Sequence, residues 1–393
     1  MKRKFLTIAL LLCFTLMMGA CGKTEEAKPE ESGLSIAEPI PGWDENEPQE
    51  EPEIESQETD IPEPEIPESD EIRPGMYRSE LTNEWIDESL KDQRPIAVMV
   101  DNETTALPHF GVNDADIVYE IMNSTKNGRI TRLMPIIKDW QKITQFGSIR
   151  SARPTNYILM WEYNAVLCHD GGPYYIDIYN QQAQTDHMSG GFARFSNGKS
   201  AEFTEYLTYD SYTNSSKGKT YGGLKQRFES EKIETTYNKY YPGPHFTFSN
   251  TDQDLSSMSG AIPCNQIALP FPHTSSTLKY NDANGTYDYY VYGKAHVDAG
   301  KNNETTNFKN LIIQSCKHTQ LDENGYLLYD AISSGDGWFI SGGYAVPINW
   351  KKTGDINPTE FTYKSDGQPV TLNTGKTYIS LVPADSWGEL KID

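Results

Sequence analysis

The sequence predicts an α+β protein in which a mixed α/β domain at 76–250 precedes a mainly antiparallel β domain at 251–393. In the first domain, continuous apolar runs typical of buried strands alternate with a helix-like segment. In the second, short segments of alternating apolar and polar residues are separated by recurring turn signals. About 318 of the 393 residues belong to this region, which is enough for two domains or one large one.

The chain opens with the pattern of a secretory signal. Residues 2–4 are basic, residues 5–18 are apolar, and two small residues precede Cys21. An apolar run of about 14 residues is shorter than the ~20 that a spanning helix needs. We therefore expect a signal peptide at 1–20 that is cleaved. The ending resembles the lipobox of bacterial lipoproteins, which implies an acylated Cys21 that anchors an extracytoplasmic protein to the cell membrane. The alternative is an ordinary signal peptide with an incidental cysteine.

An acidic, proline-rich tether follows at 21–75. Residues 22–75 hold 19 acidic and 3 basic residues, about −16 of the formal −22 of the chain. Such a stretch has too little apolar surface to offset the entropy of ordering it, so we expect it to be disordered. The overall charge therefore says little about the ligand. A tail that binds a cationic partner is the alternative to a spacer.

Three cysteines remain after the tether: Cys168, Cys264 and Cys316. An odd number cannot all pair, and none has the close spacing of a metal motif. We expect mostly free, buried thiols, with one disulfide as the alternative. No metal and no cofactor is indicated.

The first domain reads as four strands and one helix. Each strand is a short apolar run bounded by turn residues, and Lys126-Asn127-Gly128 is a plausible hairpin turn. Tyr206 to Pro244, rich in Tyr, Ser and Gly, is expected to hold surface loops. The expected strands are 95–100, 116–122, 132–137 and 165–168, and the expected helix runs from 155 to about 162.

The second domain reads as antiparallel β. Segments 287–292 and 311–314 have strand-like patterns. Turn signals recur at 322–325, 365–367 and 373–375, separated by single short strands.

Eight motifs lie along the chain in a recognisable order: Arg94–Asn102, Ala115–Glu120, Arg129–Arg132, Gly147–Arg153 and His169–Gly172, then Gly337-Trp338, Asn349–Lys352 and Gly375–Ile379. Together they resemble the YerB family of bacterial lipoproteins. The match extends from about Arg94 to Pro383 with the motifs in the same order, and it implies N- and C-terminal domains of unassigned function with no reaction to carry over. A Pro-His-Asn segment that members often have in mid-chain has no clear counterpart here, which puts any site built on it in doubt.

The preferred ligand site is Arg150, Ser151 and Arg153. They lie between a predicted strand and a predicted helix, with Pro154 at the first helical position. Two guanidinium groups beside free helix N–H groups suit phosphate or carboxylate. The alternative is that one arginine pairs with an acid such as Asp101 or Glu120 inside the fold.

Further candidates follow or lie in the predicted strands. His169 and Asp170, weak candidates for an acid or base, follow a buried strand, where α/β folds usually place ligands. The more common role of such a histidine is that of a hydrogen-bonded turn residue. The glycine pair after them permits close approach of backbone to a ligand. The remaining ligand-binding candidates are Asp101, Asn102, Glu120, Arg132, Gly171 and Gly172.

Two hypotheses about function follow. The first is a non-catalytic binding protein for an anionic component of the cell envelope or for a partner protein. The alternative is a transferase or hydrolase that acts on a phosphate-containing wall polymer, which predicts a deep cleft where His169, Asp170 and Arg150 converge. Neither involves nucleic acid, and no motif decides whether the chain is an enzyme.

Overall fold

A twelve-stranded sheet forms the centre of the computed structural model, which describes residues 72–393. The signal peptide, Cys21 and nearly all of the expected tether lie outside the described residues. The fold is mostly β with few helices, which is consistent with the strand content of the expected α+β class, whereas the mixed α/β character expected of the first domain stays a prediction. None of the helices in residues 72–393 is long and apolar enough to cross a membrane.

Both halves of the sequence contribute strands to the twelve-stranded sheet. Its order is β15-β27-β26-β23-β30-β5-β6-β3-β8-β9, with β28 paired to β27 and β4 paired to β6. The first half supplies β3 (Ile96–Val98), β4 (Val100–Asp101), β5 (Ile117–Met122), β6 (Thr131–Ile137), β8 (Val166–His169) and β9 (His187–Ser189). The second supplies β15 (Ile262–Pro263), β23 (Asn310–Cys316), β26 (Ser334–Ser341), β27 (Tyr344–Lys351), β28 (Glu360–Tyr363) and β30 (Thr377–Pro383).

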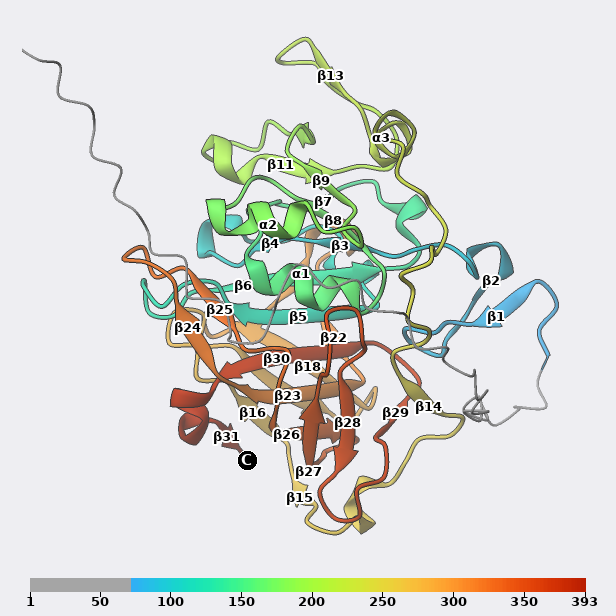
Figure 1. Ribbon diagram of the computed structural model, residues 1–393, viewed down its shortest axis with the longest axis vertical. Coiled ribbons are helices and arrows are strands. Elements are labelled where there is room, and N and C mark those ends of the chain that lie inside the picture. The colour runs from blue at the N-terminus through green and yellow to red at the C-terminus, as the bar shows by residue number, and fades with distance from the viewer. Residues whose placement is uncertain (1–71) are drawn as a thin grey trace, which may run out of the picture. The chain divides into compact units, whose positions relative to one another are not determined.

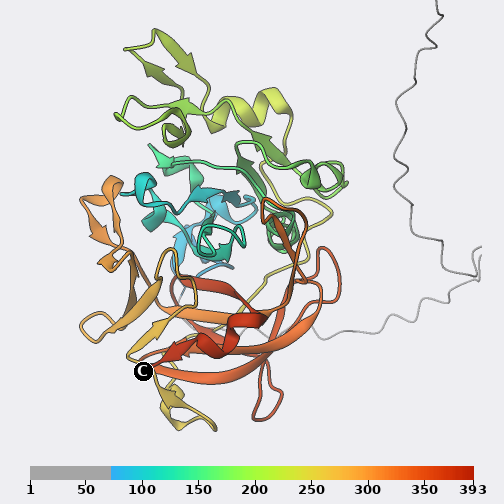
Figure 2. The ribbon, with the colours of Figure 1, turned by 90° about the vertical axis from the view of Figure 1, so that its left-hand side faces the viewer.

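Strands β5 and β30 join the two halves of the sequence. They run parallel, with Thr377 opposite Ile117 and Leu381 opposite Ile121, and lie side by side in Figure 1. Figure 2 shows the early strands above the late ones in the same stack. Strands from both sides of the boundary expected near residue 250 therefore belong to one continuous sheet.

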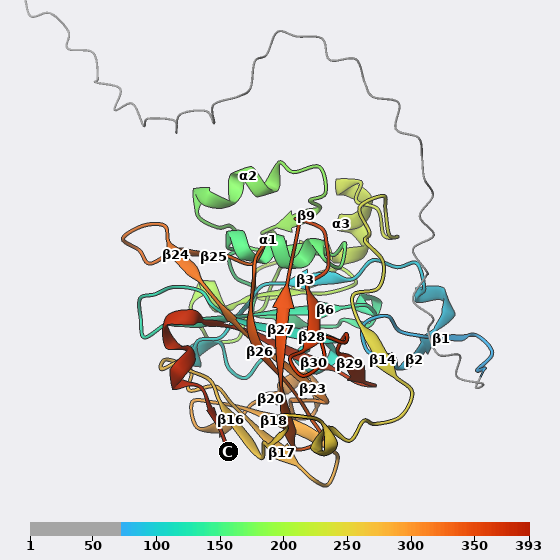
Figure 3. The ribbon, with the colours of Figure 1, turned by 60° about the horizontal axis from the view of Figure 1, so that its bottom comes forward.

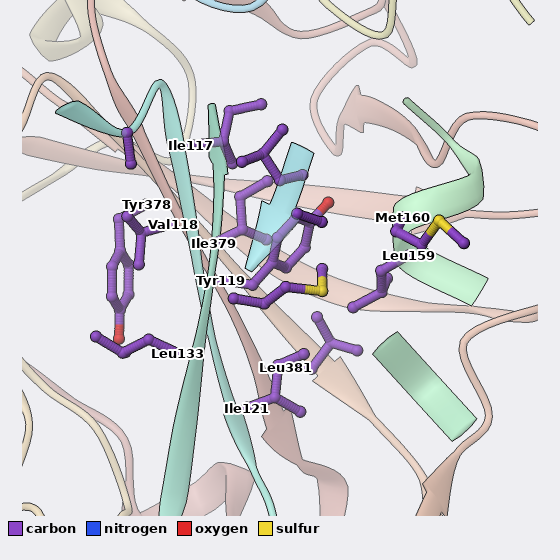
Figure 4. Close-up of a cluster of buried hydrophobic side chains, with 14 of the residues drawn as sticks. Ile117, Val118, Tyr119, Ile121, Leu133, Leu159, Met160, Tyr378, Ile379 and Leu381 are labelled. Carbon is purple, nitrogen blue, oxygen red and sulfur yellow. The ribbon is translucent and has the colours of Figure 1, made fainter. Parts of the chain in front are cut away.

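Strand β5 is buried along its whole length, and all of its side chains except that of Glu120 are apolar or aromatic. Alternate side chains of a strand point to opposite faces, and both faces of β5 are buried. Tyr119 and Ile121 point toward Leu159 and Met160 of helix α1 (Pro154–Trp161), whereas Val118 points to the other face (Figure 4). The helix begins at Pro154, one residue earlier than predicted, because proline fits the first helical position.

The other elements surround this core. The expectation of surface loops over 206–244 missed α3 (Leu224–Glu231), whose Phe228 stacks on Trp140 at 4.6 Å between ring centroids. The remaining helix is α2 (Asp177–Asn180). A six-stranded sheet contains β16 (Gln266–Ala268), β17 (Thr277–Asn281), β18 (Thr286–Val291), β19 (Lys294–Ala295), β22 (Asn307–Phe308) and β31 (Lys391–Ile392).

Smaller sheets complete the described strands. They are formed by β1 (Met76–Arg78) and β2 (Trp85–Asp87); β7 (Phe146–Gly147), β10 (Ala193–Arg194) and β11 (Glu205–Leu207); β12 (Tyr212–Asn214) and β13 (Lys219–Tyr221); β14 (Thr247–Ser249) and β29 (Thr371–Asn373); β20 (Val297–Asp298) and β21 (Glu304–Thr305); and β24 (His318–Gln320) and β25 (Leu327–Tyr329).

Cys168, Cys264 and Cys316 are free and buried. Burial raises the pKa of each of the three thiols to about 12, so they are protonated and unreactive at neutral pH.

Candidate anion site

Three arginines come together where β4 and β6 meet the segment that leads into α1. Arg132 on β6 lies opposite Asp101 on β4 in the sheet register. The backbone N–H of Arg150 donates to the carbonyl of Met99 at 2.9 Å, which holds the segment beside these strands. Arg153 is the last residue before α1. Backbone pairing thus explains why the arginine motif lies next to residues that precede it by 20 to 50 positions.

Arg150 is already paired with acids. Its Nε lies 2.5 Å from Oδ2 of Asp101, which is buried, and its Nη1 lies 3.0 Å from Oε2 of Glu202. This pair is the alternative expected from the sequence, in which one arginine pairs with an acid such as Asp101 instead of binding a ligand. Arg150 and Asp101 neutralise each other, so the charge of Arg150 is not free to bind an anionic ligand.

Arg132 and Arg153 differ from Arg150 because neither forms an ion pair with a described carboxylate. Their side chains are buried in residues that are 8% and 9% exposed, and their Nε atoms have no hydrogen-bond partner among residues 72–393. Each donates through Nη1 to a main-chain carbonyl, Arg132 to Ser151 at 2.5 Å and Arg153 to Ala152 at 2.9 Å. Two buried positive charges therefore lie together without an acid to balance them.

The electrostatics agree with this geometry. Burial, and then the positive charge of Arg153, lowers the pKa of Arg132 to about 9. Burial also lowers the pKa of Arg153 to about 10, against the opposing effects of Tyr326 and of Asp322 at longer range. Both shifts mark a site that disfavours further positive charge and favours a negative one.

A small, partly open cavity of about 10 Å³ lies against these two arginines. That volume holds about one water-sized group. Asn123, whose Oδ1 is also buried without a partner in the described part of the chain, lines it together with Arg132 and Arg153. Leu327 is also part of the lining.

The hairpin of β24 and β25 covers the arginines. The ring of Tyr326 lies 4.4 Å from the guanidinium carbon of Arg153, a cation–π contact. The loop before it is held by three hydrogen bonds: from Ser124 Oγ to the carbonyl of Asn324, from Thr125 N to the carbonyl of Gly325, and from Tyr175 OH to the carbonyl of Leu321. Figure 3 shows the hairpin beside α1.

His169 and Asp170 point in different directions. The Nδ1 of His169 lies 2.7 Å from the carbonyl of Gly171 and its Nε2 lies 3.0 Å from Nδ1 of His187. Burial lowers the pKa of His169 to about 4, so its ring is neutral at pH 7. Asp170 instead lies 3.3 Å from Arg194. The enzyme hypothesis requires His169 beside Arg150. The backbone N–H of Asp170 donates to the carbonyl of Arg150 at 3.0 Å, but the hydrogen bonds of the His169 ring in residues 72–393 go to Tyr157, Gly171 and His187.

The serine and glycines of the motifs shape the backbone of the site. Ser151 Oγ donates to the carbonyl of Asp170 at 2.8 Å, so its hydroxyl is used within the fold. Gly171 has φ +68°, in the left-handed region that favours glycine. A Cβ on Gly172 would lie 2.3 Å from Ile176 and 3.1 Å from the carbonyl of Ala152, so close packing requires glycine there.

Glu120 and Asn102 lie outside the arginine cluster. Glu120 is fully buried and its carboxylate accepts hydrogen bonds from both halves of the chain. The side chain of Asn102 donates into the same network. The donors that lie closer to the Glu120 carboxylate are the hydroxyls of Thr131, Ser276, Tyr289 and Tyr378, at 2.6–2.7 Å. The network places Glu120 between the β sheets, with no oxygen left for a ligand.

Sequence reasoning missed Tyr326, Asn123, Arg194 and Glu205. Tyr326 reaches the cluster from a hairpin about 170 positions further along the chain, and no local pattern indicates that contact. A signal existed for Arg194: Ser189-Gly190-Gly191 is a second paired-glycine turn, like the one after Asp170.

In residues 72–393, no three His, Cys, Asp or Glu side chains are grouped to hold a metal ion.

Comparisons with known proteins agree on one family. A model described as "Protein of unknown function (DUF3048) N-terminal domain" matches residues 81–222, and the model of the corresponding C-terminal domain matches residues 267–379. A Bacillus subtilis (strain 168) protein named "Putative lipoprotein YerB" is 25% identical over 309 residues, which cover 78% of this chain and 86% of that protein. The crystal structure of the YerB protein from Bacillus subtilis is similar with a TM-score of 0.63 and 20% identity, covering 81% of this chain and 99% of that one.

Proposed function

The chain belongs to the DUF3048 family, which confirms its resemblance to YerB, and on that premise we propose that it is a membrane-anchored envelope protein that binds an anion. The anion site is formed by Arg132 and Arg153. The anchor is the acylated Cys21, and the acidic tether that follows holds the fold away from the lipid surface.

One observation carries the proposal: the two arginines are buried, and neither forms an ion pair with a carboxylate of residues 72–393. Burying a charge without a counter-ion costs several kcal/mol. A fold that serves only stability would place an apolar side chain or an ion pair at these positions. Guanidinium groups match the oxygens of phosphate or carboxylate in a bidentate way. An anionic ligand would supply the missing charge and bond the free Nε–H groups.

The small volume of the cavity limits how much of the ligand it can hold. A single ligand oxygen fits a volume of about 10 Å³, whereas a complete phosphate group does not. Tyr326 and Leu327 would have to move outward for the whole group to reach both arginines. Three hydrogen bonds hold the loop at 321–325 and Leu327 is buried, so this outward shift would break native contacts, and their cost would lower the net affinity for the ligand.

The alternative, a transferase or hydrolase on a phosphate-containing polymer, needs an acid or base beside the arginines. His169 is neutral and hydrogen-bonded to His187, and Arg150 is paired with Asp101 and Glu202, so neither group is poised for acid or base chemistry on a ligand at the arginines. Binding without chemistry is therefore the better supported function. Its ligand class is an anionic component of the envelope, or an acidic segment of a partner protein.

Thermal unfolding of residues 76–393 with sulfate, phosphate or pyrophosphate tests this function. A ligand at 100 times its Kd that binds only the folded state adds about 2.7 kcal/mol to the free energy of unfolding. Arg132→Met and Arg153→Met should each abolish this gain. The control is Arg129→Met, which removes an arginine that pairs with the exposed Asp385. If no anion stabilises the parent, or if all three variants respond as the parent does, the proposal is wrong.

The anchor has a separate test. A Cys21→Ser variant of the full chain should lose acyl labelling and move from the membrane fraction to the soluble fraction. A labelled, membrane-bound variant would show that Cys21 is not the anchor.

A further inference from the structure

Asp170 and Glu205 both face the same nitrogen of Arg194. Nη2 of Arg194 lies 2.6 Å from Oε2 of Glu205 and 3.3 Å from Oδ2 of Asp170. The two acids differ in exposure: the side chain of Glu205 is 1% exposed and that of Asp170 is 42% exposed. One guanidinium group is therefore shared by a buried acid and an exposed one.

The surrounding charges do not balance the second acid. Arg150, on the neighbouring segment, is held by Asp101 and Glu202. Arg227 on α3 is held by Glu231 at 2.7 Å.

The histidines nearby add no positive charge at neutral pH. Burial lowers the pKa values of His169 on β8 and His187 on β9. One positive charge thus faces two carboxyl groups, and two adjacent carboxylates resist ionising together.

The pKa of Glu205 follows from this arrangement. Burial raises it most, and the hydrogen bond with Asp170 and the charge of Asp170 raise it further, to about 8, although Arg194 opposes the shift. The backbone N–H of Phe192 donates to Oε1 of Glu205 at 2.9 Å and fixes the carboxyl group in this position.

The pair brackets the arginine motif. The backbone N–H of Asp170 donates to the carbonyl of Arg150 at 3.0 Å, and the N–H of Ile149 donates to the carbonyl of Glu205 at 2.8 Å. Asp170 also packs on a turn: a Cβ on Gly190, which has φ +60°, would lie 2.9 Å from its Oδ1. The acids are thus fixed on both sides of the segment that carries Arg150 and leads to Arg153.

We propose that Asp170 and Glu205 hold one proton between them and that this proton is needed for tight oxyanion binding at the neighbouring arginines. The inference rests on the proposed function and adds its regulation by pH. With the proton in place, the pair has a single negative charge, which Arg194 balances. Without it, a second negative charge appears beside the arginine motif and repels an incoming oxyanion.

Sulfate is the probe of choice, because it stays a dianion from pH 6 to pH 9 and any pH dependence belongs to the protein. We expect the Kd of the 76–393 protein for sulfate, measured by calorimetry, to rise about tenfold between pH 7 and pH 9. In Glu205→Gln, which keeps a neutral group at this position, the Kd should stay within about twofold over the same range. Glu202→Gln is the matched control, since it removes a neighbouring exposed carboxylate and should keep the slope of the parent.

Two outcomes overturn the proposal: a parent whose affinity does not change with pH, or a Glu205→Gln variant with the slope of the parent. If Glu205→Gln does not fold, Asp170→Asn replaces it, because Asp170 is exposed. There Glu205 faces Arg194 alone, so the fall in affinity between pH 7 and pH 9 should disappear. An unchanged slope would also contradict the proposal.

Infrared difference spectra of the ligand-free protein separate this inference from the proposed function. Burial also raises the pKa of Asp116 to about 7, so this residue contributes a protonated carboxyl band at pH 6 in every variant. A second protonated carboxyl band, from the pair, should disappear by pH 9 and be absent in Glu205→Gln. If the band behaves so but sulfate never binds, the carboxyl pair exists and the anion site does not. If no such band is found, the shared proton is refuted whatever sulfate does.

Discussion

Asp101 and Arg150 form an ion pair in which Oδ2 and Nε are 2.5 Å apart. The acid nearest to the arginine motif is therefore already engaged. This pairing is what leaves Arg132 and Arg153 as the uncompensated charges of the site. The predictions below begin with these two arginines.

Arg132→Met should leave the free energy of unfolding unchanged or raise it, by up to about 4 kcal/mol, because it replaces a buried charge that forms no ion pair in residues 72–393 by an apolar side chain. Arg94→Met is the contrasting control. Arg94 is buried and pairs with Asp186 at 2.6 Å, so its loss should cost about 2–3 kcal/mol. Urea unfolding of both variants measures the difference. A large loss in Arg132→Met would mean that Arg132 stabilises the fold and need not be kept for a ligand.

Glu120→Gln should destabilise the protein by about 2–4 kcal/mol, because an amide nitrogen cannot accept the hydroxyl hydrogen bonds that converge on the carboxylate. Tyr378→Phe removes one of these donors and should cost about 1–2 kcal/mol. Both values come from denaturant unfolding. Equal stability of Glu120→Gln and the parent would show that the network is not a stabilising link between the two halves.

The sequence was sufficient to predict several strands, but not which strands pair with each other in the sheet. Segments 116–122 and 132–137 appear as β5 and β6 close to the expected bounds, because continuous apolar runs indicate burial on both faces. Burial does not identify the partner of a strand. The pairing of β5 with β30 joins residues about 260 positions apart, and tertiary packing alone decides it.

The position of the arginine motif could be predicted, because it depends on residues that are adjacent in the sequence. Arg150, Ser151 and Arg153 lie between a strand and a helix as expected, because the motif carries its own helix start at Pro154. Which arginine pairs with Asp101 depends on side-chain distances that no local pattern contains. Tyr326 and Glu205 come from distant segments, so the cover of the arginines and the carboxyl pair could not be expected.

Residues 72–250 alone should not fold, because separation from the second half would remove the partner of β5 and expose an edge with apolar residues on both faces. We expect this fragment to be insoluble or to lack dispersed amide resonances in NMR spectra. Residues 72–393 are the control. A fragment with a native-like spectrum would instead support the two separate domains predicted from the sequence.

The protein should lose stability between pH 6.5 and pH 4 through His109. Its Nε2 bonds the carbonyl of Asp101 and its Nδ1 bonds His296, and burial lowers its pKa to about 4. The unfolded chain, with an ordinary histidine pKa of about 6.5, takes up a proton in this window that the folded protein does not. Stability is therefore present above pH 6.5 and falls toward pH 4, by up to about 1.4 kcal/mol per pH unit from this residue.

Denaturant unfolding at several pH values checks the role of His109. His109→Gln should show a shallower decline than the parent, whereas His273→Gln, at a partly exposed histidine beside Glu103, should not. Parallel declines in the parent and His109→Gln would contradict the assignment.

The arginine site itself is tested most directly by NMR spectra of the arginine side chains during a sulfate titration of the 76–393 protein. The Nε–H groups of Arg132 and Arg153 have no hydrogen-bond partner within the described range 72–393, whereas those of Arg94 and Arg227 donate to Asn164 and Glu231. We predict that the first two resonances shift together and saturably as sulfate is added, while the other two stay in place. If the Arg132 and Arg153 resonances do not move, or if all four move alike without saturation, the anion site does not exist.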